Sequence, residues 1–184
     1  MELFRSLRIS VGFNSLKKRA IRVRRNRGFV NLSTAQTIGI VWDITNEDDL
    51  PPISDFILMM NERGIRVDVI AIFQGKILPD KLTALRYITC LKREDLSYFY
   101  IPNTPETEKF IKTPFDILIE ITSRNCLPIR YITSLNTARC KVSSKAGDSA
   151  DRDYADIIIA VGKGVDTKEY LKQIVVYLEL INRK

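Results

Sequence analysis

The chain has 184 residues, of which 45% are hydrophobic, so it can form one domain of ordinary size and is not wholly disordered. Its net charge is +7, and it contains no histidine. The absence of histidine excludes Ser-His-Asp and Cys-His nucleophile systems and histidine-based metal sites. Any catalysis would rest on carboxylates, lysine, serine or tyrosine, and no motif indicates a cofactor or a metal.

The three cysteines, Cys90, Cys126 and Cys140, are isolated and have neither metal-binding nor redox spacing. We therefore expect free, mostly buried thiols and a cytoplasmic location. No stretch approaches the roughly 18 apolar residues of a membrane span. The N-terminus lacks the apolar core of a secretory signal, although an arginine-rich, acid-poor leader also fits an organellar transit peptide.

The positive charge is concentrated at the N-terminus. Residues 1–28 hold nine basic residues and one acid, so residues 29–184, with 20 basic and 21 acidic residues, are close to neutral. An excess of positive charge that is confined to one segment indicates that this segment has a binding partner of its own. The nine are Arg5, Arg8, Lys17, Lys18, Arg19, Arg22, Arg24, Arg25 and Arg27.

This N-terminal arm (residues 1–28) is predicted to form a basic helix over 3–25, because its apolar residues recur at near-helical spacing. Gly12 and Asn14 weaken the middle of that helix, and Gly28 is predicted to stop it. A polar connector is predicted over 29–36, followed by an α/β domain over 37–184.

From residue 37 onward, strands and helices alternate. Strands are predicted where apolar runs end in polar residues, and helices where a proline or an N-cap precedes a periodic segment. The predicted strands cover 37–45, 66–74, 85–91, 115–122, 139–143 and 154–161. One helix is predicted to begin at Pro51 or Pro52 and to end at Gly64. Further helices are predicted over 104–113, 125–138 and 165–184, and a polar connection over 144–153.

This alternation predicts an α/β fold: a single three-layer domain with a mostly parallel sheet of five to six strands, Rossmann-like, preceded by the basic N-terminal helix. The connection between the last two strands has about ten residues, near the minimum for a parallel crossover. The pairing of these two strands is therefore the open point of the topology.

Ligands of an open α/β sheet bind outside the carboxyl ends of its strands. Asp43 ends the first predicted strand and Glu120 lies near the end of the fourth, so the two are weak candidates for an acid–base pair or a cation site. The alternative is that each carboxylate caps a helix or orders a loop.

Two turns bear on phosphate binding. The segment WDITNEDD (42–49) is acidic and has no glycine fingerprint, which argues against a dinucleotide site. The run Gly162-Lys163-Gly164 offers two glycines and a cation before a predicted helix, so it is a weak anion candidate. The alternative there is an ordinary glycine turn with a solvated lysine.

The arm is the strongest functional signal, because its cations suit phosphate contacts on RNA or an anionic membrane surface. Arginine outnumbers lysine seven to two in the arm, and its planar fork favours nucleic acid over lipid. The aromatic run at 98–100 can stack bases, or pack under the following helix. A merely solvated basic helix is the alternative for the arm.

Four segments of the chain are distinctive: the basic N-terminal helix, TAQTIGIVWDITNEDD (34–49), LKREDLSYF (91–99) and FDILIEIT (115–122). In these segments the chain resembles a small uncharacterised bacterial family of unknown function. The resemblance covers nearly the whole chain and implies a bacterial cytosolic protein. It carries over no catalytic residue, because that family has no assigned activity.

These patterns do not determine a biochemical activity, a substrate or an oligomeric state. The leading hypothesis is a non-enzymatic protein whose arm binds structured RNA, such as that of the ribosome, or another polyanion. The second is a peripheral membrane protein that uses the same arm. The third is a small-molecule or nucleotide-binding enzyme that uses the crevice at the strand ends. We expect the arm to be dispensable for folding.

Overall fold

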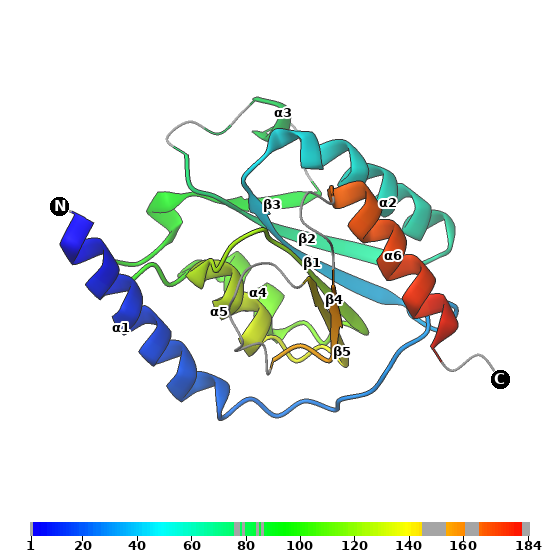
Figure 1. Ribbon diagram of the computed structural model, residues 1–184, viewed down its shortest axis with the longest axis horizontal. Coiled ribbons are helices and arrows are strands. Elements are labelled where there is room, and N and C mark those ends of the chain that lie inside the picture. Colours follow the sequence, from blue (N-terminus) through cyan, green and yellow to red (C-terminus); the bar gives the residue numbers. More distant parts are fainter. Residues whose placement is uncertain are drawn as a thin grey trace.

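The computed structural model describes residues 2–75, 78, 80–83, 85, 87–144, 154–160 and 166–181, and over these residues it contains one sheet of six strands (Figure 1). The strands are β1 (Thr37–Ile44), β2 (Arg66–Phe73), β3 (Ile88–Leu91), β4 (Ile117–Ile121), β5 (Cys140–Ser144) and β6 (Ile157–Ile159). The helices are α1 (Glu2–Ala20), α2 (Leu50–Glu62), α3 (Asp80–Thr83), α4 (Pro105–Lys112), α5 (Leu127–Leu135) and α6 (Thr167–Leu180), with short 3-10 turns η1 (Glu47–Asp49) and η2 (Arg93–Asp95).

The strands lie in the order β3-β2-β1-β4-β5-β6, and every neighbouring pair is parallel. This is the strand order of the doubly wound Rossmann fold. The predicted three-layer, Rossmann-like α/β fold is therefore confirmed. The pair β5 and β6, left open by the sequence, is parallel as well.

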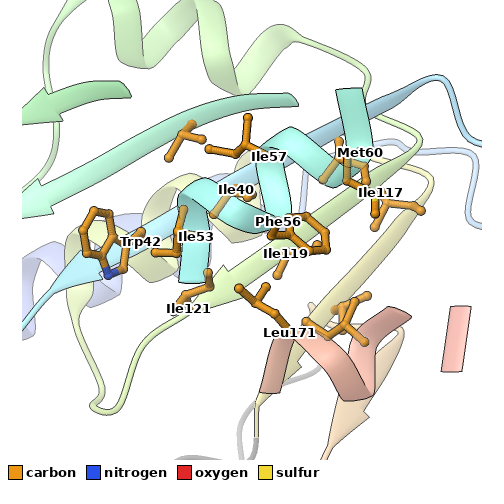
Figure 2. Close-up of a cluster of buried hydrophobic side chains, with 14 of the residues drawn as sticks. Ile40, Trp42, Ile53, Phe56, Ile57, Met60, Ile117, Ile119, Ile121 and Leu171 are labelled. Carbon is orange, nitrogen blue, oxygen red and sulfur yellow. The ribbon is translucent and has the colours of Figure 1, made fainter. Parts of the chain in front are cut away.

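Both faces of the sheet are covered by helices. On one face, side chains of β1 and β4 meet α2 and α6, and Figure 2 shows this cluster with Ile40, Trp42, Ile53, Phe56, Ile57, Met60, Ile117, Ile119, Ile121 and Leu171 labelled. On the other face, Val41 and Leu118 pack against Phe110 of α4 and Ile132 of α5. Because the central strands are buried on both sides, their sequences are continuously apolar.

Two of the predicted helix ends depend on local chemistry and are confirmed. Gly64 follows α2 with φ of 75°, a left-handed conformation that glycine adopts without steric cost. Thr104 caps α4, because its side-chain oxygen accepts a hydrogen bond from the backbone N–H of Thr107.

The N-terminal helix ends earlier than predicted. It stops at Ala20, not at residue 25, and residues 23–30 have no regular secondary structure. The physical reason is a distant partner: the chain leaves the helix so that Arg25 can reach Asp156, which lies 131 residues further along the sequence. Helical periodicity carries no information about such a contact.

The helix α1 packs across α5 and adds a layer outside it (Figure 1). Leu16 is buried against Leu127, Tyr131 and Leu135. Gly12, which seemed only to weaken the helix, allows this approach, because a Cβ atom there would collide with Leu127 and lie 2.5 Å from the carbonyl oxygen of Phe99.

The connector over residues 29–36 is more than a polar link. Val30, Leu32 and Ala35 are buried in the cluster beneath α2 and α6. The side-chain amide of Asn31 donates hydrogen bonds to the carbonyl groups of Glu179 and Ile181 at the end of α6. The path from α1 into β1 is thus attached to the domain along its length.

A substitution of Gly12 tests the docking of α1. We expect Gly12→Ala to destabilise the protein by about 1–3 kcal/mol through overpacking against α5, although alanine favours an isolated helix by about 1 kcal/mol. The measurement is the free energy of unfolding in urea, together with the rate of trypsin cleavage within α1.

The matched control is Asn14→Ala, which makes a similar gain in helix propensity at an exposed position of the same helix. It should be neutral or slightly stabilising. Equal stability and equal trypsin resistance of wild type and Gly12→Ala would contradict the close docking.

Candidate functional site

The nine cations of the arm do not form one uniform surface. Two of them are hydrogen-bonded to side chains of the α/β domain: Arg25 pairs with Asp156, and Arg19 donates a hydrogen bond to the hydroxyl of Tyr131. Within the described part of the chain, the other seven form no ion pair. Five of these, Lys17, Lys18, Arg22, Arg24 and Arg27, are exposed near the end of α1 and in the segment that follows it, whereas Arg5 and Arg8 lie near its start.

The ion pair of Arg25 is almost completely buried. Its two terminal nitrogens donate to the two carboxylate oxygens of Asp156 at 2.6 and 2.7 Å, and the side chains are 5% and 12% exposed. The same guanidinium also donates to the carbonyl groups of Ala138 and Tyr154. Arg25 therefore holds residues 21–27 in place and is not available to a phosphate.

A groove of about 1100 Å³ runs between α1, the segment 21–27 and α5. Its lining residues include no aspartate or glutamate. The basic side chains among them are Lys17, Arg24, Arg25, Arg27, Arg130 and Lys141. Arg130 and Lys141 come from the α/β domain, so the groove combines cations of the arm with cations that the sequence analysis did not select.

Lys141 is buried beneath the groove, where its ammonium donates to the carbonyl groups of Thr133 and Ser134 at the end of α5. A cation is favourable there because the C-terminal carbonyl groups of a helix carry partial negative charge. Burial lowers the pKa of Lys141 to about 7; Arg25 contributes to the lowering, and Asp156 opposes it. The groove thus has a cation beneath it that titrates near neutral pH.

Asp43 and Glu120 are both buried on the α5 face of neighbouring strands. Asp43 accepts two hydrogen bonds from Arg124, at 2.6 and 2.8 Å, so it orders the loop between β4 and α5. Glu120 accepts hydrogen bonds from Ser143 and Tyr154. Each carboxylate has its own set of partners, and a catalytic role of either remains a hypothesis.

The other predicted sites have different outcomes. The run Gly162-Lys163-Gly164 lies outside the described residues, as does most of the 144–153 connection. The free thiols are confirmed, with Cys126 and Cys140 buried and Cys90 half-buried. Burial raises the pKa of Cys126 to about 12, so this thiol is not a nucleophile at neutral pH.

Neither a metal centre nor a membrane-spanning helix is present among the described residues. No group of three or more Cys, Asp or Glu side chains is arranged there to hold a metal ion. None of the helices in that part of the chain has the length and apolar character needed to cross a membrane.

The fold and the groove define a single-domain, Rossmann-like α/β protein with a basic helix docked outside one of its helical layers. The chain matches the family of unknown function DUF6913 over residues 11–181, and it belongs to that family. No curated protein matches it. The expected membership in a family of unknown function is confirmed, and no activity can be assigned from it.

A substitution of Arg25 tests the structural role of the buried ion pair. We expect Arg25→Gln to destabilise the protein by about 3 kcal/mol, because it leaves the buried Asp156 carboxylate without its counterion. Denaturant unfolding measures this loss. Adding Asp156→Asn should recover part of it.

The control is Arg24→Gln at the neighbouring exposed position, which should change the stability by less than about 0.5 kcal/mol. If Arg25→Gln were as mild as Arg24→Gln, the ion pair would not hold the segment 21–27.

The pKa of Lys141 predicts a pH dependence of stability. The folded-state pKa of about 7 lies below the ordinary lysine value of 10.5, so the unfolded chain binds more protons between these pH values. Stability should therefore rise with pH in this window, by at most about 1.4 kcal/mol per pH unit.

The measurement compares wild type with Lys141→Met in urea at pH 6.5 and pH 9. The difference in unfolding free energy between the two proteins should shift in favour of wild type at the higher pH. The same difference at both pH values would show that Lys141 keeps its proton throughout.

Proposed function

We propose that this protein binds structured RNA of the cytoplasm, such as that of the ribosome, through the groove between α1, the segment 21–27 and α5. The observation that carries the proposal is the basic lining of this groove: Lys17, Arg24, Arg27 and Arg130 line it beside the ion-paired Arg25 and the buried Lys141, and its lining residues include no acid. Such a surface attracts phosphates and releases counterions when it binds them.

The length of the groove favours a strand over a single small anion. Its lining extends along α1 from Ser6 to Ala20, which is about 20 Å of helix. A stacked strand advances by about 3.4 Å per nucleotide, so this length suits roughly five or six nucleotides. The exposed Lys17, Arg24 and Arg27 line the groove and can each meet a phosphate.

The groove also has an apolar component, which supports nucleic acid over other polyanions. Its lining includes Ile9, Phe13 and Val23 beside the cations, and the ring of Tyr154 lies under the guanidinium of Arg130 at 5.1 Å. Unstacked bases of RNA loops bind to aromatic and arginine planes, whereas phosphates bind to the cations. The combination fits an unpaired segment of a structured RNA.

One observation favours the alternative, an anionic membrane surface. Phe4, Leu7 and Val11 are 68%, 62% and 41% exposed, and they recur at helical spacing on the face of α1 opposite the buried Gly12 and Leu16. An apolar stripe with cations nearby is typical of a helix that lies on a membrane. This face does not belong to the groove, so the two functions depend on different residues.

Charge removal in the groove tests the RNA proposal. We expect Arg24→Gln/Arg27→Gln to weaken binding of a structured RNA at least tenfold, because each charge-assisted contact contributes about 1.5 kcal/mol or more. The slope of log affinity against log salt should decrease in magnitude by about 1.4, the value for two phosphate contacts on a single strand. Titrations of a fluorescently labelled ribosomal RNA fragment at several salt concentrations measure both quantities.

The matched control is Lys168→Gln/Lys172→Gln, which removes two exposed cations from α6 on the other face of the sheet. It should bind as wild type does. Equal losses in both double variants would mean that only net charge matters and would contradict the groove.

The Phe4→Ser/Leu7→Ser variant separates RNA from membrane binding. The proposal expects it to bind RNA normally. The membrane function replaces the proposed one if three results are obtained together. Wild type binds vesicles that contain phosphatidylglycerol, the Phe4→Ser/Leu7→Ser variant does not bind them, and wild type does not bind RNA.

A further inference from the structure

A second group of cations gathers at the start of α1, away from the groove. The guanidinium carbons of Arg5, Arg8 and Arg93 lie 5.8, 5.5 and 4.2 Å from the centre of the Tyr100 ring. Arg8 also lies 4.6 Å from the ring of Tyr98. Residues of α1 thus meet residues of the loop after β3, which the sequence does not suggest.

The charge of this cluster is not balanced within the described residues. None of its three arginines forms an ion pair there, and the two acids nearest to Arg93 in the sequence have other partners. Asp95 accepts a hydrogen bond from the backbone N–H of Lys92, and Glu94 pairs with the Lys92 side chain. The positive charge of the three arginines around this ring therefore has no counterion among the described residues, and an anionic ligand would supply one.

The cluster borders a cavity of about 220 Å³, lined by Arg5, Gln74, Arg93, Leu96 and Tyr100. Gln74 directly follows β2, and Arg93 and Leu96 follow β3. The cavity therefore lies at the carboxyl ends of parallel strands, where open α/β sheets bind their ligands.

The walls of this cavity are held in position. Arg93 donates hydrogen bonds to the carbonyl groups of Leu96 and Ser97, so its guanidinium is fixed before any ligand arrives. Tyr100 has φ of 60°, a left-handed conformation that costs a non-glycine residue about 1–2 kcal/mol. The turn from Ser97 to Ile101 maintains that conformation through three hydrogen bonds and keeps the ring among the arginines. Strain of this kind is characteristic of ligand sites.

We propose that this cavity binds the phosphate group of a small phosphorylated compound, with Arg5 and Arg93 as its main ligands and Arg8 as a third cation nearby. Arginine forks match phosphate oxygens in geometry, and a phosphate dianion balances more of the local charge than a carboxylate does. The volume is below the range of roughly 300–1,000 Å³ that suits larger ligands, so the organic part is short.

The remaining lining residues suit that organic part. Leu96 supplies an apolar wall. The side-chain N–H of Gln74 donates to the sulfur of Cys126, so the amide oxygen of Gln74 is the atom that can accept a hydrogen bond from a ligand hydroxyl. The cavity is completed by α1 through Arg5, and the close approach of Gly12 to the carbonyl group of Phe99 places α1 beside this loop.

Isothermal titration of the full chain tests the site, with inorganic phosphate, glycerol 3-phosphate and glycerol as probes. We expect wild type to bind both phosphate compounds with millimolar or tighter affinity and not to bind glycerol. If glycerol 3-phosphate binds more tightly than inorganic phosphate, the ligand is a phosphomonoester. If the two bind equally, the ligand is free phosphate. Both results support a phosphate site.

The decisive variant is Arg93→Met, which should weaken binding at least tenfold, while Arg93→Lys should fall between it and wild type because it keeps the charge but loses the fork. The control is Arg66→Met at the opposite end of β2, where the arginine is exposed and should not affect binding. Circular dichroism and melting curves confirm that the variants are folded. No binding by wild type, or equal affinities of Arg93→Met and wild type, would overturn the proposal.

This site does not depend on the proposed RNA function, since Arg93 does not line the groove. Arg93→Met should therefore keep its affinity for RNA, and Arg24→Gln/Arg27→Gln should keep its affinity for phosphate. A loss of both activities in Arg93→Met would show that the two surfaces are one, and would overturn the separate site.

Discussion

The buried ion pair between Arg25 and Asp156 fixes the course of the chain between α1 and β1. Asp156 also accepts a hydrogen bond from the backbone N–H of Lys141, so one carboxylate connects the arm with β5 and with the residues just before β6. A buried ion pair of this kind adds little net stability, because the desolvation of the two charges offsets their attraction. Here it decides where the segment 21–27 runs, and that segment forms one wall of the basic groove.

The docking of α1 divides one basic segment among several roles. The face that contains Gly12 and Leu16 packs against α5, whereas the opposite face exposes Phe4 and Leu7. The cations on either side of this helix consequently point to two separate surfaces, the groove beside α5 and the tyrosine cluster after β3. Residues that lie within one turn of each other in the sequence can therefore have different partners.

Although the strand order is that of the Rossmann fold, the residues at the strand ends do not indicate a dinucleotide enzyme. In a sheet of this order, the crevice between the carboxyl ends of β1 and β4 is the usual ligand position. Asp43 and Arg124 pair across these two strand ends, and the turn after β1 is acidic. The candidate sites lie instead beside α5 and beyond β2 and β3. One fold hosts many functions, so the function has to be inferred from these sites and not from the fold.

The sequence by itself determined the features that depend on neighbouring residues. Continuous apolar runs marked the buried strands, Gly64 and Thr104 marked helix ends, and the charge count separated the arm from a neutral body. These signals are local, because burial on both faces of a sheet, a left-handed glycine and an N-cap each leave their pattern within a few residues.

Only the tertiary structure decided which cations are free and which are bound. Arg25 and Arg24 are adjacent and chemically identical, yet one is buried against Asp156 and the other is exposed in the groove. In the same way, Gly12 weakens an isolated helix but permits close packing on α5. The partners involved are more than 100 residues away, and a pattern read along the chain cannot show which distant carboxylate or side chain folding will bring into contact.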